Sequence, residues 1–81
     1  IQTNLSVSDI ALLFRLLDEN KLINYKHKTE IYHFIASNFK TEKQSDISKA
    51  SIKNKFLSPD NTALKNMSVI LSNLKITLNN L

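Results

Sequence analysis

Cysteine, glycine and tryptophan are all missing from this chain of 81 residues, and proline occurs once. Because there is no cysteine, the protein can form neither disulfides nor thiolate metal sites, a composition compatible with the cytoplasm, where we expect it. Because there is no glycine, it cannot build a phosphate-binding P-loop or a dinucleotide-binding turn, whose backbone conformations require that residue. The composition therefore argues against nucleotide-dependent chemistry, and we expect no cofactor.

Long hydrophobic runs are also missing. No stretch of about 18 apolar residues is present, and the first residues lack the basic flank and apolar core of a signal peptide, so no membrane partner is expected. The hydrophobic content of 42% is enough for one compact helical domain over residues 1–81,. Because the sequence begins with Ile1 rather than Met, we expect it to be a C-terminal fragment of a longer protein.

Candidates for catalysis are few. His27 and His33 are six positions apart and do not share a helical face, so they do not predict a metal site,. Nothing in the sequence resembles the strained turn of a serine nucleophile or an oxyanion hole. We therefore expect neither enzyme activity nor a bound metal in this chain.

The first predicted helix begins with a capping box, in which the Ser6 hydroxyl and the Asp9 carboxylate bind free amides of the first turn,. It runs to about Glu19, and two apolar stripes on its surface predict a central helix with other helices on both flanks. In the absence of glycine, left-handed backbone positions are expected at asparagines near the ends of segments. The candidates are Asn20, Asn24 and Asn38.

Three further helices follow. The second covers about 28–38, and the third runs from the N-cap Ser48 to residue 56 or 57,. The fourth is predicted to start at Pro59, with Ser58 as its N-cap and Asp60 in its first turn, and to continue to the chain end,. No segment alternates apolar and polar residues for long enough to predict a strand. The fold class is therefore all-α: a four-helix domain with a helix-turn-helix-like unit and a long C-terminal helix.

The segment 46–56, DISKASIKNKF, is the strongest indication of function. At 100° per residue, Ile52 and Phe56 point inward together, whereas Ala50 and Asn54 point outward,. Lysine, serine and asparagine side chains can bind base edges or phosphates in the major groove, so we predict a recognition helix that contacts double-stranded DNA. The predicted DNA-binding residues are Lys49, Ser51, Lys53, Asn54 and Lys55.

Local charge agrees with this interpretation, because residues 40–55 contain five lysines and only two acidic residues, Glu42 and Asp46. A helix with a polar outer face can equally be a solvated surface helix. The link of about eight residues before it is longer than the three or four of a standard helix-turn-helix. The single arginine, Arg15, lies far from this segment, although DNA-reading surfaces favour arginine,. Both interpretations stay open from the sequence.

The last predicted helix carries a seam in which leucine or methionine recurs at steps of three and four as far as Leu81,. Such a seam predicts a homodimer that places two DNA-reading units on a palindromic site. Alternatively, the seam closes the core over the second stripe of the first helix, and both roles can hold together. The alternative function is thus a protein interaction module without DNA contact. The predicted dimer contacts are Leu64, Met67, Leu71, Leu74 and Leu78.

Three segments together resemble a known family. They are VSDIALLFRLLDENKLI, KTEIYHFIASNF and ISKASIKNKFLSPD, and the leucine-rich last helix follows them. Over about residues 5–81 the chain is similar to the C-terminal domain of RteC-type regulators and related proteins of Bacteroides mobile elements. The resemblance implies a helix-turn-helix-like domain of a transcription regulator that controls excision or transfer of conjugative transposons. It maps DNA contact onto the same five side chains of the third helix and carries no catalytic motif.

Overall fold

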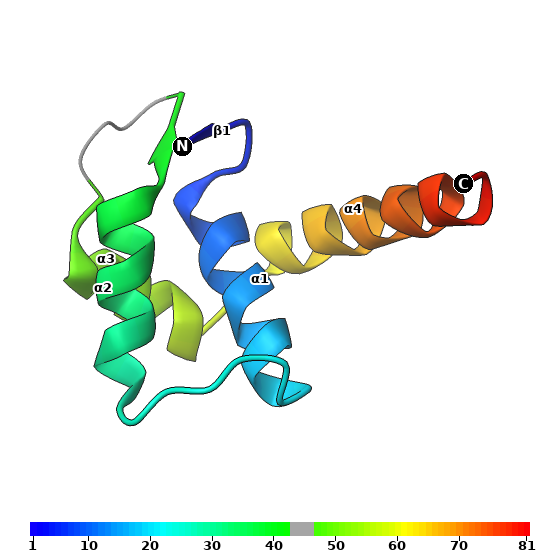
Figure 1. Ribbon diagram of the computed structural model, residues 1–81. Coiled ribbons are helices and arrows are strands. Elements are labelled where there is room, and N and C mark those ends of the chain that lie inside the picture. Colours follow the sequence, from blue (N-terminus) through cyan, green and yellow to red (C-terminus); the bar gives the residue numbers. More distant parts are fainter. Residues whose placement is uncertain (43–46) are drawn as a thin grey trace.

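A computed structural model describes residues 1–42 and 47–81, and its helices are those expected of an all-α domain. The elements are β1 (Gln2–Thr3), α1 (Val7–Glu19), α2 (Lys28–Asn38), β2 (Lys40–Thr41), α3 (Lys49–Leu57) and α4 (Asn61–Asn79). The first three helices form a compact group, and α4 leaves it as a long projecting arm (Figure 1). The prediction of a four-helix, all-α fold is confirmed. Within the described ranges, no helix combines the length and the apolar character needed to cross a membrane.

The helix α1 begins as the sequence predicts. The Ser6 hydroxyl accepts a hydrogen bond from the Asp9 amide (3.1 Å), and the Asp9 carboxylate accepts one from the Ser6 amide (3.3 Å). Two donors that the first turn of a helix leaves without partners are satisfied reciprocally in this way. The capping box therefore fixes where the central helix starts.

Two hydrophobic clusters lie on different sides of α1, as its two apolar stripes predict. The larger joins α1, α2 and α3, and within it the Tyr32 and Phe56 rings meet edge to face with centroids 5.4 Å apart. The smaller joins α1 to the first half of α4 through Leu12, Ala63 and Met67. The central position of α1 is thus confirmed. The buried members of the larger cluster are Val7, Ile10, Ala11, Ile31, Tyr32, Ile35, Ile47, Ile52 and Phe56.

A short parallel pairing of β1 with β2 is a feature that the sequence did not predict. Gln2 pairs with Lys40 and Thr3 with Thr41, and the Lys40 amide donates to the Ile1 carbonyl (2.8 Å). Two residues per strand are too few to show the alternation by which strands are recognised in a sequence. The pairing also joins segments far apart in the chain. Its consequence is that the segment leaving α2 is held against the N-terminal residues.

The end of α1 corrects a second expectation. The left-handed residue is Lys21, with φ of 57°, rather than Asn20, which has φ of −90°. The Lys21 amide donates to the Asp18 carbonyl and the Leu22 amide to the Leu17 carbonyl, both at 2.9 Å. These two bonds form a Schellman motif, which demands a left-handed residue one position after the cap. The hydrogen bonds of the helix end, and not the preference of asparagine, decide which residue takes that conformation.

We predict that Lys21→Gly stabilises the protein by about 0.5–1 kcal/mol, because glycine adopts positive φ without the steric cost that lysine carries. Urea unfolding followed by circular dichroism measures the change. The control is Lys21→Ala, which removes the charge and keeps the Cβ. If alanine stabilises as much as glycine, relief of backbone strain is not the cause.

The start of α4 also differs from the prediction. Asp60 is the N-cap, its carboxylate accepting from the Ala63 amide (2.7 Å), so Pro59 precedes the helix instead of opening it. Ser58 is instead the C-cap of α3, where its amide donates to the Asn54 carbonyl (3.0 Å). The Ser8 hydroxyl also donates to Asp60 (3.4 Å), which ties the start of α4 to the start of α1.

The two assignments of this cap are separated by two alanine substitutions. We expect Asp60→Ala to destabilise the protein by about 1 kcal/mol, the usual effect of removing an N-cap side chain. We expect Ser58→Ala to change stability by less than half as much. Thermal unfolding of both variants at one pH gives the comparison, and the reverse order would restore Ser58 as the cap.

Candidate nucleic-acid interface

The helix α3 is fixed on its inner side by the larger cluster. Ile52 and Phe56 are almost fully buried, at 0% and 1% exposure, and they pack against α1 and α2. The Ser48 hydroxyl accepts from the Ser51 amide (3.1 Å), so the predicted N-cap is present. With one side anchored in this way, the orientation of the other side is determined.

Of the five residues predicted to bind DNA, Asn54 points directly away from this core, Ser51 and Lys53 flank it, and Lys49 and Lys55 lie at the boundary with the core,. Lys49, Lys53 and Asn54 are exposed, while Ser51 and Lys55 are half-buried. At 100° per residue, Lys49 and Lys53 lie along one edge of the outer face, and Lys55 lies along the opposite edge. The positive charges therefore border a central strip that contains Asn54. Two other charges counted in the sequence, Lys43 and Asp46, lie outside the described residues.

Surrounding residues agree with this division of the lysines between two edges. Lys49 stands beside α2, where it lines a groove together with His33. Lys55 instead lines a hollow formed with the N-terminal segment, next to Leu5 and Thr41. The two side chains thus face different neighbours on opposite flanks of the helix.

The long link before α3 is anchored at both of its described ends. On one side, β2 pairs with β1 and Thr41 is buried. On the other side, Ile47 joins the larger cluster directly before the N-cap. One anchor is thus the strand pairing and the other is the core of the three helices, so α3 begins at a defined place with its polar face exposed.

Arg15 has a role that sequence reasoning missed. One nitrogen of its guanidinium group donates to the Phe56 carbonyl (3.1 Å) and the Leu57 carbonyl (3.0 Å), and the group also approaches the Glu19 carboxylate (3.5 Å). A cation at the C-terminus of a helix satisfies carbonyls that lack partners and opposes the negative end of the helix dipole. The only arginine therefore clamps α3 to α1 and is not part of the outer face of α3. No local pattern links residue 15 to carbonyls 41 and 42 positions away.

Arg15→Met is expected to destabilise the protein by about 1.5 kcal/mol, because methionine keeps the apolar stem and loses the charged hydrogen bonds. Glu19→Gln removes only the exposed ion pair and should cost less than about 0.5 kcal/mol. Urea unfolding of both variants tests the difference. Equal effects would assign the stability to the surface ion pair instead of the clamp.

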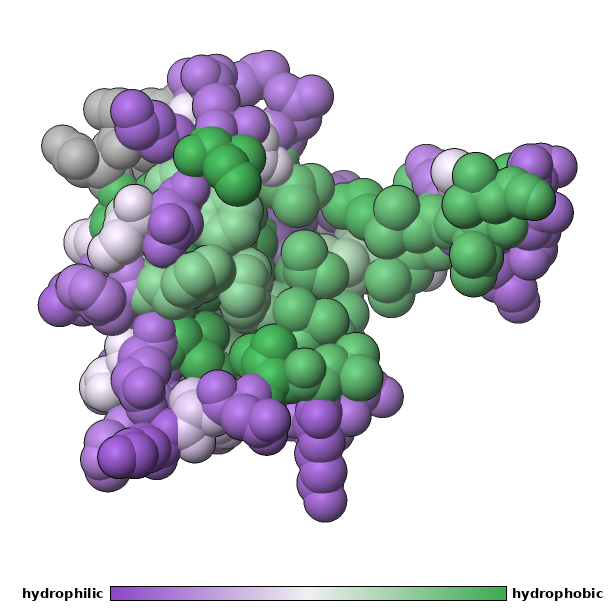
Figure 2. All heavy atoms as spheres, viewed as in Figure 1, coloured by the Kyte–Doolittle hydropathy of each residue, from purple (hydrophilic) through white to green (hydrophobic). Residues whose placement is uncertain are grey.

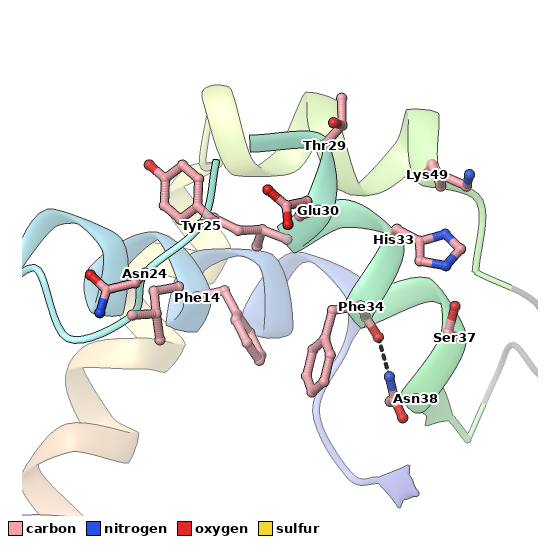
Figure 3. A pocket seen from close by; sticks show the side chains of 12 residues that line it. Phe14, Asn24, Tyr25, Thr29, Glu30, His33, Phe34, Ser37, Asn38 and Lys49 are labelled. Atoms are coloured by element: carbon pink, nitrogen blue, oxygen red, sulfur yellow. Dashed lines mark hydrogen bonds between the residues drawn. The ribbon is translucent and has the colours of Figure 1, made fainter. Parts of the chain in front are cut away.

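A groove of about 1050 Å³ runs along α2 on the side that leads to α3. Figure 3 shows the rings of Phe14 and Phe34 side by side in it, while His33 on α2 and Lys49 at the start of α3 lie apart from the two rings. The Phe14 and Phe34 centroids are 6.0 Å apart, and Phe34 remains 50% exposed. Part of this aromatic pair is therefore open to solvent.

Hydrogen bonds set the ionisation of two groups along the groove. The Glu30 carboxylate accepts from the His27 amide (2.8 Å) and the Lys26 amide (2.6 Å), which lowers the pKa of Glu30. The Tyr25 hydroxyl donates to Asp18 (2.6 Å), and this bond to a carboxylate raises the pKa of Tyr25. Both shifts favour the ordinary charge states at neutral pH. Neither group is poised for proton transfer there, since an acid or base catalyst near pH 7 needs a pKa close to that value.

Potential metal ligands are dispersed over the described parts of the chain, where no three histidine or acidic side chains form a group able to hold an ion. His27 precedes α2 as its N-cap and His33 is exposed on that helix. Comparison with known proteins found no matching family, no similar curated protein and no similar solved structure. A function must therefore be argued from the sequence and from the surface of this molecule.

Proposed function

We propose that the protein is a DNA-binding domain whose α3 enters the major groove. The observation that carries this proposal is the arrangement of lysines along both edges of a helix whose opposite side is locked in the core. A helix lying in the major groove has a phosphate backbone on each side of it. Lys49 and Lys53 would meet one backbone and Lys55 the other.

The strip between these edges carries side chains suited to reading bases. Asn54 can donate and accept with an adenine edge, and the Ala50 methyl can contact the methyl group of thymine. Ser51 can bond to several bases or to phosphate. These three residues would supply sequence preference, and the lysines would supply most of the affinity.

The neighbouring helices fit the same use. The order α2, link, α3 corresponds to a helix-turn-helix with an extended turn, and α1 completes the three-helix core. The first turn of α3 has no acidic residue. No carboxylate there neutralises the positive end of the helix dipole, which lies at the end nearest Lys49. The clamp from Arg15 to the other end of α3 would keep the helix in place when phosphates pull on its lysines.

The biological role that we propose is transcriptional regulation of mobile-element excision or transfer, in the cytoplasm and without enzyme activity. Its support is the resemblance of residues 5–81 to the C-terminal domain of RteC-type regulators. A regulator needs a module that recognises a DNA site, and the surface of α3 would be that module.

A second candidate function is protein interaction through α4. Its specific support is exposure: Leu64, Leu71, Leu74 and Leu78 are between 44% and 66% exposed, although leucine is usually buried,. Met67 is 2% exposed and packs on α1, so it belongs to the core of the single chain. The predicted seam therefore divides between a buried part and an exposed part. A homodimer through the exposed part is compatible with DNA binding by α3.

Salt dependence tests the DNA proposal. For binding to a short duplex, log K should fall with log salt concentration by about 0.9 for each phosphate neutralised. We expect the double variant Lys53→Glu, Lys55→Glu to lose duplex binding, because it reverses charge on both edges of α3. Fluorescence anisotropy with labelled duplex from the promoters of the element that encodes the protein measures both effects.

The matched control is Lys65→Glu with Lys75→Glu, which changes net charge equally but lies on α4. This control should retain most of the affinity. Equal losses in the two double variants would show that net charge alone governs binding, and unchanged binding by the α3 variant would refute a recognition role for that helix.

A further inference from the structure

The outer half of α4 presents an apolar face on which none of the described residues packs. Leu71 is 44% exposed, Leu74 56% and Leu78 66%, and exposure increases toward the end of the helix. Figure 2 shows hydrophobic residues continuing from the three-helix group onto the projecting arm without a polar break. This surface is too continuous to be a scatter of single exposed leucines, which would need no explanation.

The exposed leucines extend a face that is already used within the chain. Ala63 and Met67, on the first two turns of α4, are buried against α1, and Leu71, Leu74 and Leu78 continue from them at steps of three and four,. The same stripe thus passes from the core into open space as α4 leaves α1. The first half of the stripe packs against leucines of α1. We therefore expect its second half to pack against the leucines of a similar helix.

The outer half has little to stabilise it as a helix by itself. A helix of two or three turns is marginal in water, and packing normally supplies the missing stability. After Lys65 the only charged residue is Lys75, so no ion pair along the helix can help,. Ile76 and Thr77 are β-branched and have lower helix propensity. The arm therefore calls for an apolar surface on which to pack.

A matching surface exists on α1 of the same molecule. Leu13 and Leu16 border the smaller cluster and are only half-buried. The outer half of α4 cannot fold back to cover them, because α4 is one uninterrupted helix of 19 residues that points away from α1 (Figure 1). Within residues 1–42 and 47–81, two apolar surfaces thus remain uncovered, and a single chain cannot bring them together.

We propose that a second copy of the chain covers both surfaces, with the outer half of each α4 lying across α1 of the other copy. A twofold axis makes this exchange reciprocal, since each copy offers the same arm and the same receiving surface. The charges agree with a self-complementary contact: the exposed leucines carry none, and Lys75 lies at the edge of their stripe,. A partner of opposite charge is not called for.

This dimer deepens the proposed function, and its use on DNA rests on that function. Two copies related by a twofold axis would present two α3 helices to the two halves of a palindromic site. The dimer contact itself involves α4 and α1 and none of the five DNA-contacting residues. The two proposals therefore fail independently.

Light scattering after size-exclusion chromatography tests the dimer. At micromolar concentration the parent chain should show twice its mass of 9.3 kDa. Leu74→Glu should restore the monomer mass with unchanged helix content in the compact group. Ile76→Glu is the matched control, because Ile76 is equally exposed (59%) and lies on the opposite side of α4, so this variant should remain dimeric. A monomeric parent, or equal effects of the two variants, would overturn the proposal.

Cross-linking distinguishes the reciprocal contact from a simple coiled coil of two α4 helices. The chain has no cysteine, so single cysteines can be introduced without interference. A mixture of Leu78→Cys and Leu13→Cys chains should form mixed disulfides under mild oxidation. If Leu78→Cys links only to itself, the two arms pair with each other and the reciprocal arrangement is wrong.

Measurements of DNA binding show which of the two proposals fails. Leu74→Glu should bind a single half-site as tightly as the parent and lose the added affinity for a site with two halves. The variant with Lys53→Glu and Lys55→Glu should lose DNA binding and keep the dimer mass. A dimer without duplex binding would overturn only the DNA proposal, and duplex binding by a strict monomer would overturn only the dimer.

Discussion

The rest of the structure depends on the docking of α3 against α1. Ile52 and Phe56 supply the apolar contact, and Arg15 reaches from α1 to two carbonyls at the end of α3. Apolar packing holds a helix at a set distance from its neighbour. It fixes the rotation of the helix and its position along the axis less firmly, because dispersion and burial are not directional. Two directed hydrogen bonds from a planar cation fix the position along the axis. These contacts on the inner side of α3 thus determine which of its faces is exposed.

The same docking explains how a link longer than in a standard helix-turn-helix can be accommodated. The turn of a standard unit is short, so it sets the angle between its two helices by itself. Here the chain leaves α2 through a short pairing with the N-terminal residues and re-enters the core at Ile47. Long-range contacts at both ends replace the local geometry of a tight turn. The position of α3 is therefore a property of the whole three-helix core.

Local signals predicted the helices well, and long-range interactions account for what they missed. The capping box at Ser6 and the N-cap at Ser48 need only neighbouring residues, so both could be recognised in the sequence. The left-handed Lys21 follows from how α1 ends, and the clamp by Arg15 joins residues 41 positions apart. For the candidate site, helical periodicity predicted which side of α3 is exposed. It could not predict that the only arginine would support that helix from behind.

The seam of α4 shows how one sequence pattern can serve two purposes in succession. Steps of three and four describe a continuous stripe, but they do not say where the covering helix ends. In this fold α1 covers the stripe around Met67, and the leucines beyond it are left exposed. Because α1 also holds α3, a partner seated on α4 and α1 would be connected to the outer face of α3 through one rigid helix. In the proposed dimer, the separation of the two α3 helices would then be set by packing between helices. No flexible linker would intervene, so the spacing of two DNA half-sites would be a fixed property of the protein.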